Sequence, residues 1–121
     1  MRSKVVLSLV ALALLATAFA AGGGKATTIQ GYVLDSACAY TKNLDKPISA
    51  ECAKKCAAAG SALVILTKDG TLYLPIDSAT PATGQNAKLL PFAGQRVTAT
   101  GKVYERAGSK AIVIEKIAAA R

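Results

Sequence analysis

The chain has 121 residues, a formal net charge of +8 and a hydrophobic fraction of 52%. This length is sufficient for one small domain and too short for two. The sequence contains no histidine, which excludes Ser–His and Cys–His dyads, and it shows no recognisable catalytic motif. We therefore expect a non-catalytic protein.

The first 20 residues have the three parts of a secretory signal peptide. Arg2 and Lys4 supply the positive charge, residues 5–15 form an apolar run, and small residues precede a cleavage site after Ala20. The run is shorter than the about 20 apolar residues that a membrane-spanning helix needs. We expect a periplasmic or secreted protein, with residues 1–20 as the signal peptide and no stable membrane span.

The remaining chain divides into a glycine-rich, flexible leader at residues 21–26 and a single domain at residues 27–118. Runs of β-branched and other apolar residues, some alternating with polar ones, predict five strands. Gly31 predicts a bulge or a close backbone approach in the first strand. Asp69-Gly70 is a strong hairpin signal between the second strand and the third. The strands are expected at residues 27–34, 62–67, 71–76, 95–104 and 110–117.

Helical segments are expected between these strands. Ser49 is a suitable N-cap for a short helix over residues 50–59, and Gly60 follows as a C′ residue. Residues 86–92 predict a helical turn, and the polar residues 35–47 predict a loop. This order predicts a mainly β fold, a small five-stranded OB-like barrel with one short helix after the first strand and a helical turn before the fourth. An open antiparallel sheet with one covering helix is the alternative.

Three short motifs carry a resemblance to a known group of proteins. They are residues 31–38, which contain an Asp-x-x-Cys pattern, residues 52–56, which have Cys-x-x-x-Cys spacing, and residues 94–101. The chain resembles small, largely uncharacterised exported bacterial proteins that are OB-fold-like, over residues 27–117. The resemblance implies a fold and an exported location, and it brings no established activity. Some similar sequences have a histidine after the first cysteine, and its absence here argues against a histidine-assisted metal or haem role.

The three cysteines, Cys38, Cys52 and Cys56, are the most informative feature of the chain. An oxidising compartment favours disulfides, and three cysteines cannot all pair within one molecule. On a helix, Cys52 and Cys56 have Cβ atoms about 5–6 Å apart, whereas a disulfide needs about 3.5–4.5 Å. We therefore expect a disulfide from Cys38 to Cys52 or to Cys56. The third thiol is then buried, or it joins two chains in a disulfide-linked dimer.

Two other roles for the cysteines remain open. Thiolates select Cu(I) or Zn, so the three cysteines, with Asp35 as a fourth ligand, form an alternative soft-metal site. This spacing matches no common zinc pattern. Alternatively, Cys52 could exchange disulfides, because it lies in the first turn of the predicted helix near Lys54 and Lys55. The chain has no Cys-x-x-Cys motif to support that role.

The predicted fold also indicates a candidate binding surface. OB barrels often bind ligands through aromatic and basic side chains. The residues of this kind on the predicted strands are Tyr32, Tyr73, Arg96, Lys102 and Tyr104. Export argues against nucleic acid as the partner. We expect an exported binding or accessory domain without a cofactor, whose partner is an exported protein, a peptide or a glycan.

Overall fold

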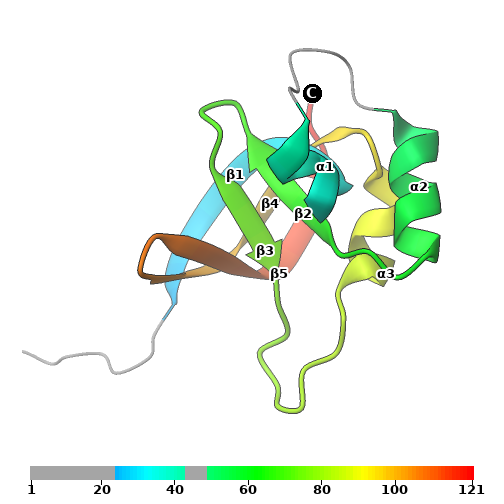
Figure 1. Cartoon of the computed structure of the whole chain (residues 1–121). Helices are drawn as coiled ribbons and strands as arrows, with labels where there is room; N and C mark the ends of the chain where they lie inside the picture. Colours follow the sequence, from blue (N-terminus) through cyan, green and yellow to red (C-terminus); the bar gives the residue numbers. More distant parts are fainter. Residues whose placement is uncertain (1–23, 43–48) are drawn as a thin grey trace, which may run out of the picture.

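The computed structural model describes residues 24–42 and 49–121, and Figure 1 shows their arrangement. The predicted signal peptide lies outside the described residues. The strands are β1 (Lys25–Asp35), β2 (Leu63–Thr67), β3 (Leu72–Pro75), β4 (Arg96–Arg106) and β5 (Ser109–Ala119). The helices are α1 (Ser36–Thr41), α2 (Ala50–Ala58), α3 (Asn86–Leu89) and the 3-10 helix η1 (Leu90–Phe92). Among the described residues, every helix is too short or too polar to span a lipid bilayer.

The five strands form a closed barrel in the order β1-β2-β3-β5-β4. The long strand β1 closes it by pairing with β2 along its C-terminal half and with β4 along most of its length. Neighbouring strands are antiparallel except β3 and β5, which pair in parallel. The segment containing α3 and η1 connects β3 to β4. The prediction of a mainly β, OB-like barrel is therefore confirmed, and the open-sheet alternative is wrong because both edges of the sheet are paired.

The predicted loop over residues 35–47 is wrong in its first part, because α1 begins directly after β1. Asp35 is the N-cap of this helix, and its Oδ2 accepts a hydrogen bond from the Cys38 amide at 3.0 Å. Residues 43–48 of the predicted loop lie outside the described residues. β1 begins at Lys25, so the last two residues of the predicted leader belong to the barrel.

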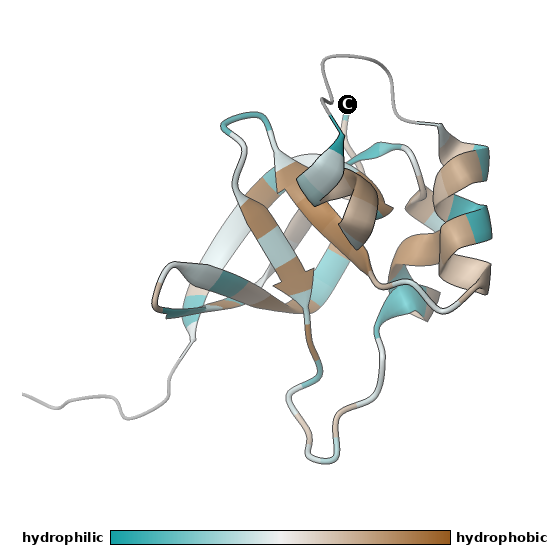
Figure 2. Ribbon diagram, viewed as in Figure 1, coloured by the Kyte–Doolittle hydropathy of each residue, from teal (hydrophilic) through white to brown (hydrophobic). Residues whose placement is uncertain are grey.

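Apolar side chains from all five strands and from α2, α3 and η1 form the core. Figure 2 shows hydrophobic residues along β2 and hydrophilic residues on the side of α2 that faces away from the barrel. The helix α2 buries Ala53, and its first residue, Ala50, lies against Gly94. Gly94 has a φ of +74°, which favours glycine, and a Cβ there would lie 2.5 Å from the Ala50 Cα. These contacts place α2 beside α3 and η1.

Two glycines of the strands lie against the backbone of a neighbouring strand. A Cβ at Gly31 would lie 2.5 Å from the Leu66 carbonyl oxygen, so the predicted close approach is confirmed. The register of the β4–β5 pair shifts between Thr100 and Gly101. At Gly101, the carbonyl group of Val113 occupies the space that a Cβ would need. Both positions therefore require glycine for reasons of space.

Candidate binding cleft and thiol cluster

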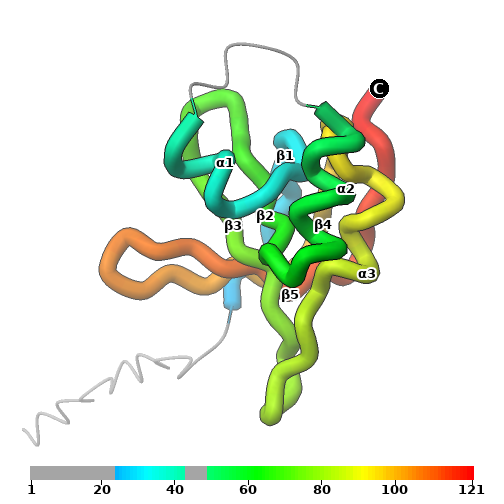
Figure 3. The backbone as a smooth tube through the Cα atoms, turned by 45° about the vertical axis from the view of Figure 1, so that its right-hand side comes forward, coloured from blue at the N-terminus to red at the C-terminus, as the bar shows by residue number. Residues whose placement is uncertain are grey.

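A cleft of about 450 Å³ lies where α1, the β2–β3 hairpin and the β4–β5 hairpin meet. Figure 3 shows α1 and the β4–β5 hairpin on one side of the barrel and α2 and α3 on the other. In OB barrels, the face of strands 2 and 3 and the loops between strands 1 and 2 and between strands 4 and 5 are the usual binding region. The principal side chains lining the cleft are Tyr40, Leu72, Leu74 and Lys110.

The cleft exposes apolar surface beside one fixed charge. Tyr40 is 78% exposed and Leu74 is 44% exposed, which is unusual for large apolar side chains that are near each other. The Lys110 Nζ donates a hydrogen bond to the Glu105 Oε2 at 3.1 Å. This hydrogen bond, together with the charge of Glu105, raises the pKa of Lys110, so the amine is protonated at neutral pH. The cleft can therefore hold an aromatic or aliphatic group next to the Lys110–Glu105 ion pair.

The structure does not gather the five residues of the predicted binding surface into one site. Tyr32 is exposed and lies opposite Arg96 in the β1–β4 pair. Tyr73 packs against the core, and Tyr104 is half-buried. Lys102 is exposed, further along β4.

The sequence analysis did not select Tyr40, the most exposed aromatic residue of the cleft. This tyrosine lies on α1, within a segment predicted to be a loop. The only signal in the sequence was a single aromatic residue within a polar stretch.

The three cysteines lie on two helices. Cys38 is on α1 and is half-buried, whereas Cys52 is exposed and Cys56 half-buried on α2. All three are free thiols, so the expected disulfide from Cys38 to Cys52 or Cys56 is not formed in this structure. Cys52 and Cys56 both lie on the intact helix α2, as predicted.

Asp35 is the one buried charged residue in the described part of the chain, with 3% of its surface exposed. Its Oδ2 caps α1, but its Oδ1 has no hydrogen-bond partner. The Ser61 hydroxyl lies beside the carboxyl group without completing a hydrogen bond to Oδ1, and its proximity lowers the pKa of Asp35. Burial acts in the opposite direction and is outweighed, with the Cys38 amide adding to the lowering. Asp35 is therefore a buried carboxylate.

The charge of Asp35 acts on two of the thiols. Burial raises the pKa of Cys38, and the negative charge of Asp35 raises it further. Burial and the same carboxylate also raise the pKa of Cys56. Metal binding requires thiolates, which this environment opposes. Across residues 24–42 and 49–121, no three His, Cys, Asp or Glu side chains are arranged to hold a metal, so the alternative site of Cys38, Cys52, Cys56 and Asp35 is not formed here.

We expect Asp35→Asn to reduce the acid dependence of stability. The folded-state pKa of Asp35 lies below its ordinary value of 3.8. Its contribution to stability is therefore present above that value and is lost as the pH falls through the folded-state pKa. Urea unfolding between about pH 6 and about pH 2 should show a steeper loss for the wild type, by at most ~1.4 kcal/mol per pH unit for one proton.

Two other carboxyl groups also have lowered pKa values, so they contribute to the pH dependence of stability in both the wild type and Asp35→Asn. The pKa of Asp69 is lowered by the Thr67 hydroxyl, and that of Asp77 by backbone amides of its own turn. Both groups are retained in Asp35→Asn, and asparagine remains a good N-cap for α1. Identical pH profiles for the two proteins would contradict the role assigned to Asp35.

No protein-family model matches the chain, and searches of curated proteins and of solved structures gave no match. The class of protein is therefore described from its fold and its candidate site alone. It is a small OB-like barrel with an open, partly apolar cleft on its usual binding face. Beside the barrel it carries three free thiols and a buried carboxylate.

Proposed function

We propose that this domain is an exported, non-catalytic binding or accessory module, and that its cleft binds a peptide segment of another exported protein. The observation that supports this most directly is the exposure of Tyr40 and Leu74, which both line the cleft. Exposed apolar surface grouped at a concave site is typical of interaction sites. The signal peptide predicted from the sequence supports export.

A peptide fits this cleft for two reasons. Its apolar side chains can pack against Tyr40 and Leu74, and a backbone carbonyl of the same segment can accept a hydrogen bond from the Lys110 amine, which has three donors and uses one for Glu105. A glycan is the competing ligand, since sugar rings also stack on tyrosine. Nucleic acid is a poor candidate for an exported protein, and its backbone would find only one charged side chain along the cleft.

Substitution of Tyr40 and Leu74 tests this function. Peptides are selected from a random phage-displayed library on the mature protein, and their affinities are measured by isothermal titration calorimetry. We expect Tyr40→Ala and Leu74→Ser each to weaken binding about tenfold or more, because anchor residues of an interface carry most of its binding energy. Tyr32→Ala is the matched control, since Tyr32 is also an exposed tyrosine but lies outside the cleft.

Two results would contradict the peptide assignment. One is the selection of peptides whose binding is insensitive to Tyr40→Ala and Leu74→Ser. The other is binding on a glycan array that depends on Tyr40 in the absence of any selected peptide, which would assign the cleft to sugars.

We also propose that oxidation after export joins Cys38 to Cys52 or Cys56. Such a bond would fix α1, which carries one wall of the cleft, to α2.

Soft-metal binding, with Cu(I) or Zn held by the three cysteines and Asp35, is the second candidate function. Two facts favour it: the buried Asp35 Oδ1 has no hydrogen-bond partner, and the Asp35 carboxyl group lies close to the Cys38 thiol. A metal retained in native mass spectrometry would support this second candidate.

A further inference from the structure

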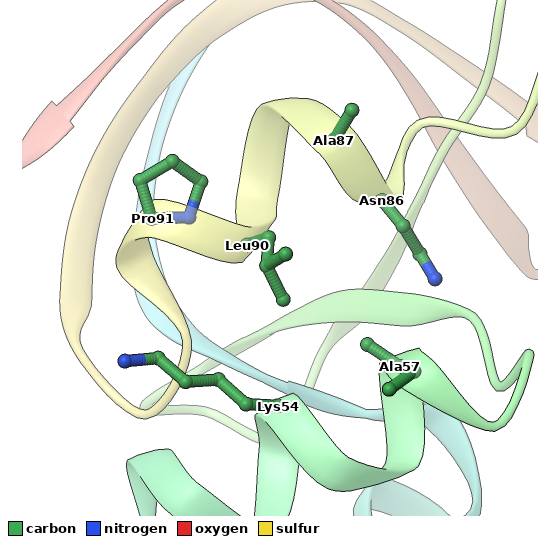
Figure 4. A pocket seen from close by; sticks show the side chains of 7 residues that line it. Lys54, Ala57, Asn86, Ala87, Leu90 and Pro91 are labelled. Atoms are coloured by element: carbon green, nitrogen blue, oxygen red, sulfur yellow. The ribbon is translucent and has the colours of Figure 1, made fainter.

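A second concave surface lies between α2 and the segment formed by α3 and η1, as Figure 4 shows. We call it the helix groove. Its volume is about 700 Å³, and it shares no lining residue with the cleft. Its apolar walls are formed by Ala57 and Ala58 of α2 and by Ala87, Leu90 and Pro91 of α3 and η1.

The helix groove leaves apolar surface uncovered. Leu90 is 41% exposed, and Figure 4 shows its side chain directed toward α2. Opposite Leu90, α2 presents alanines, whose small side chains leave space between the two helical segments. Ala53 is the only fully buried residue of α2. This helix is therefore covered by the barrel on one side and lacks a partner along the groove.

The polar groups of the helix groove differ in what they can offer a ligand. The Asn86 amide is already engaged, since its Nδ2 donates to the Ser61 carbonyl and its Oδ1 accepts from the Leu63 amide, both at 2.8 Å. Lys54 is the only charged residue of the lining, and it forms no ion pair with any described residue. Figure 4 shows its amine near Pro91, at the end of the groove away from Asn86. The groove therefore combines apolar walls with one uncompensated positive charge.

We propose that the helix groove binds a short amphipathic helix of a partner protein, with apolar side chains between α2 and η1 and a carboxylate at Lys54. Walls of alanine allow a helix to approach closely, and its apolar face would cover Leu90. The charge of Lys54, in a chain whose net charge is +8, favours an acidic partner.

A second copy of this chain is a poorer occupant of the helix groove. In a two-fold symmetric contact each groove would face the groove of the other copy, whose lining offers no acidic side chain to pair with Lys54. The proposal also extends the function proposed for the cleft. Because the two surfaces lie on different sides of the barrel, an accessory domain of this kind could join two proteins.

The test uses a phage-displayed library of single helices, randomised at positions spaced i, i+3, i+4 and i+7 and selected on the mature protein. We expect the enriched helices to carry apolar residues and an Asp or Glu. Leu90→Asp and Lys54→Glu should each weaken their binding about tenfold or more, as for other interface anchors. Ala87→Arg, which places a long charged side chain at an exposed position of the lining, should also weaken binding without touching the core.

The controls separate the helix groove from general charge and from the cleft. Lys102→Glu changes the net charge as much as Lys54→Glu does, but it lies outside the groove and should leave affinity unchanged. When the Asp or Glu of a selected helix is replaced by lysine, that helix should regain affinity for the Lys54→Glu variant. Tyr40→Ala should have no effect on these helices, so failure of the cleft proposal is a separate result.

Three outcomes would overturn the proposal. The first is that no helix is enriched, and the second is that enriched helices bind Leu90→Asp and the wild type equally. The third is saturable binding of sodium palmitate that depends on Lys54 while no helix is selected, which would assign the groove to a fatty acid.

Discussion

Replacing Gly101 with alanine is expected to destabilise the barrel by about 3 kcal/mol or more, as severe overpacking does. The added methyl group would occupy the position of the Val113 carbonyl group. Gly101 pairs with Thr27 on one side and with Ile114 on the other, so β4 cannot move aside without breaking one of the two pairings. Urea unfolding followed by circular dichroism measures the loss of stability.

Gly84→Ala is the matched control for this substitution. A Cβ at Gly84 meets no atom within 4 Å, and its φ lies outside the left-handed region. We expect a change within about 0.5 kcal/mol, because surface substitutions without such a conflict have small effects. Equal stabilities for Gly101→Ala and Gly84→Ala would show that the β4–β5 pair can rearrange around a side chain.

Oxidation is expected to raise the free energy of unfolding by about 3 kcal/mol, the value for a disulfide that closes a loop of roughly 15 residues. The effect should disappear in Cys38→Ser, because Cys38 is the common partner of both proposed pairings. One of Cys52→Ser and Cys56→Ser should lose the effect while the other keeps it, which identifies the pair. Urea unfolding with and without reductant measures the difference.

Intact mass after thiol alkylation provides the independent readout for the disulfide. The proposed bond leaves one alkylated cysteine and a loss of two hydrogens. The raised pKa values of Cys38 and Cys56 reduce their thiolate fraction, so we expect oxidation to be faster above neutral pH. Three alkylated thiols after treatment with oxidised glutathione would contradict the bond. A covalent dimer would place the remaining cysteine at an interface between two chains.

The strands and α2 were predictable because their patterns are local. Alternation around Val97 and Ala99 reveals the buried side of β4. Ser49 marks the start of α2, because its hydroxyl oxygen accepts a hydrogen bond from the Cys52 amide at 3.1 Å. In contrast, α1 has six residues and no fully buried side chain, so it carries no hydrophobic period. Its formation depends on the cap supplied by Asp35 and on its contacts with β1 and β2.

Neither concave surface could be predicted from a motif. The cleft gathers Tyr40, Leu74 and Lys110 from three segments that are distant in the sequence, and only closure of the barrel brings them together. The helix groove is lined largely by alanines, which in the sequence indicate helix formation and not a binding site. The prediction that Cys52 and Cys56 would share one helix, however, is confirmed.

Closure of the barrel by β1 has a consequence for the order of events during biosynthesis. The hydroxyl groups of Thr28 and Thr100 lie 3.1 Å apart but are separated by 72 positions in the chain. β4 is itself paired along its length with β5, which ends at Ala119. β1 can therefore close the barrel only after β4 and β5, far along the chain, have been synthesised. Such long-range pairing slows folding, and β1 leaves an unpaired edge that can contact other chains until β4 is available.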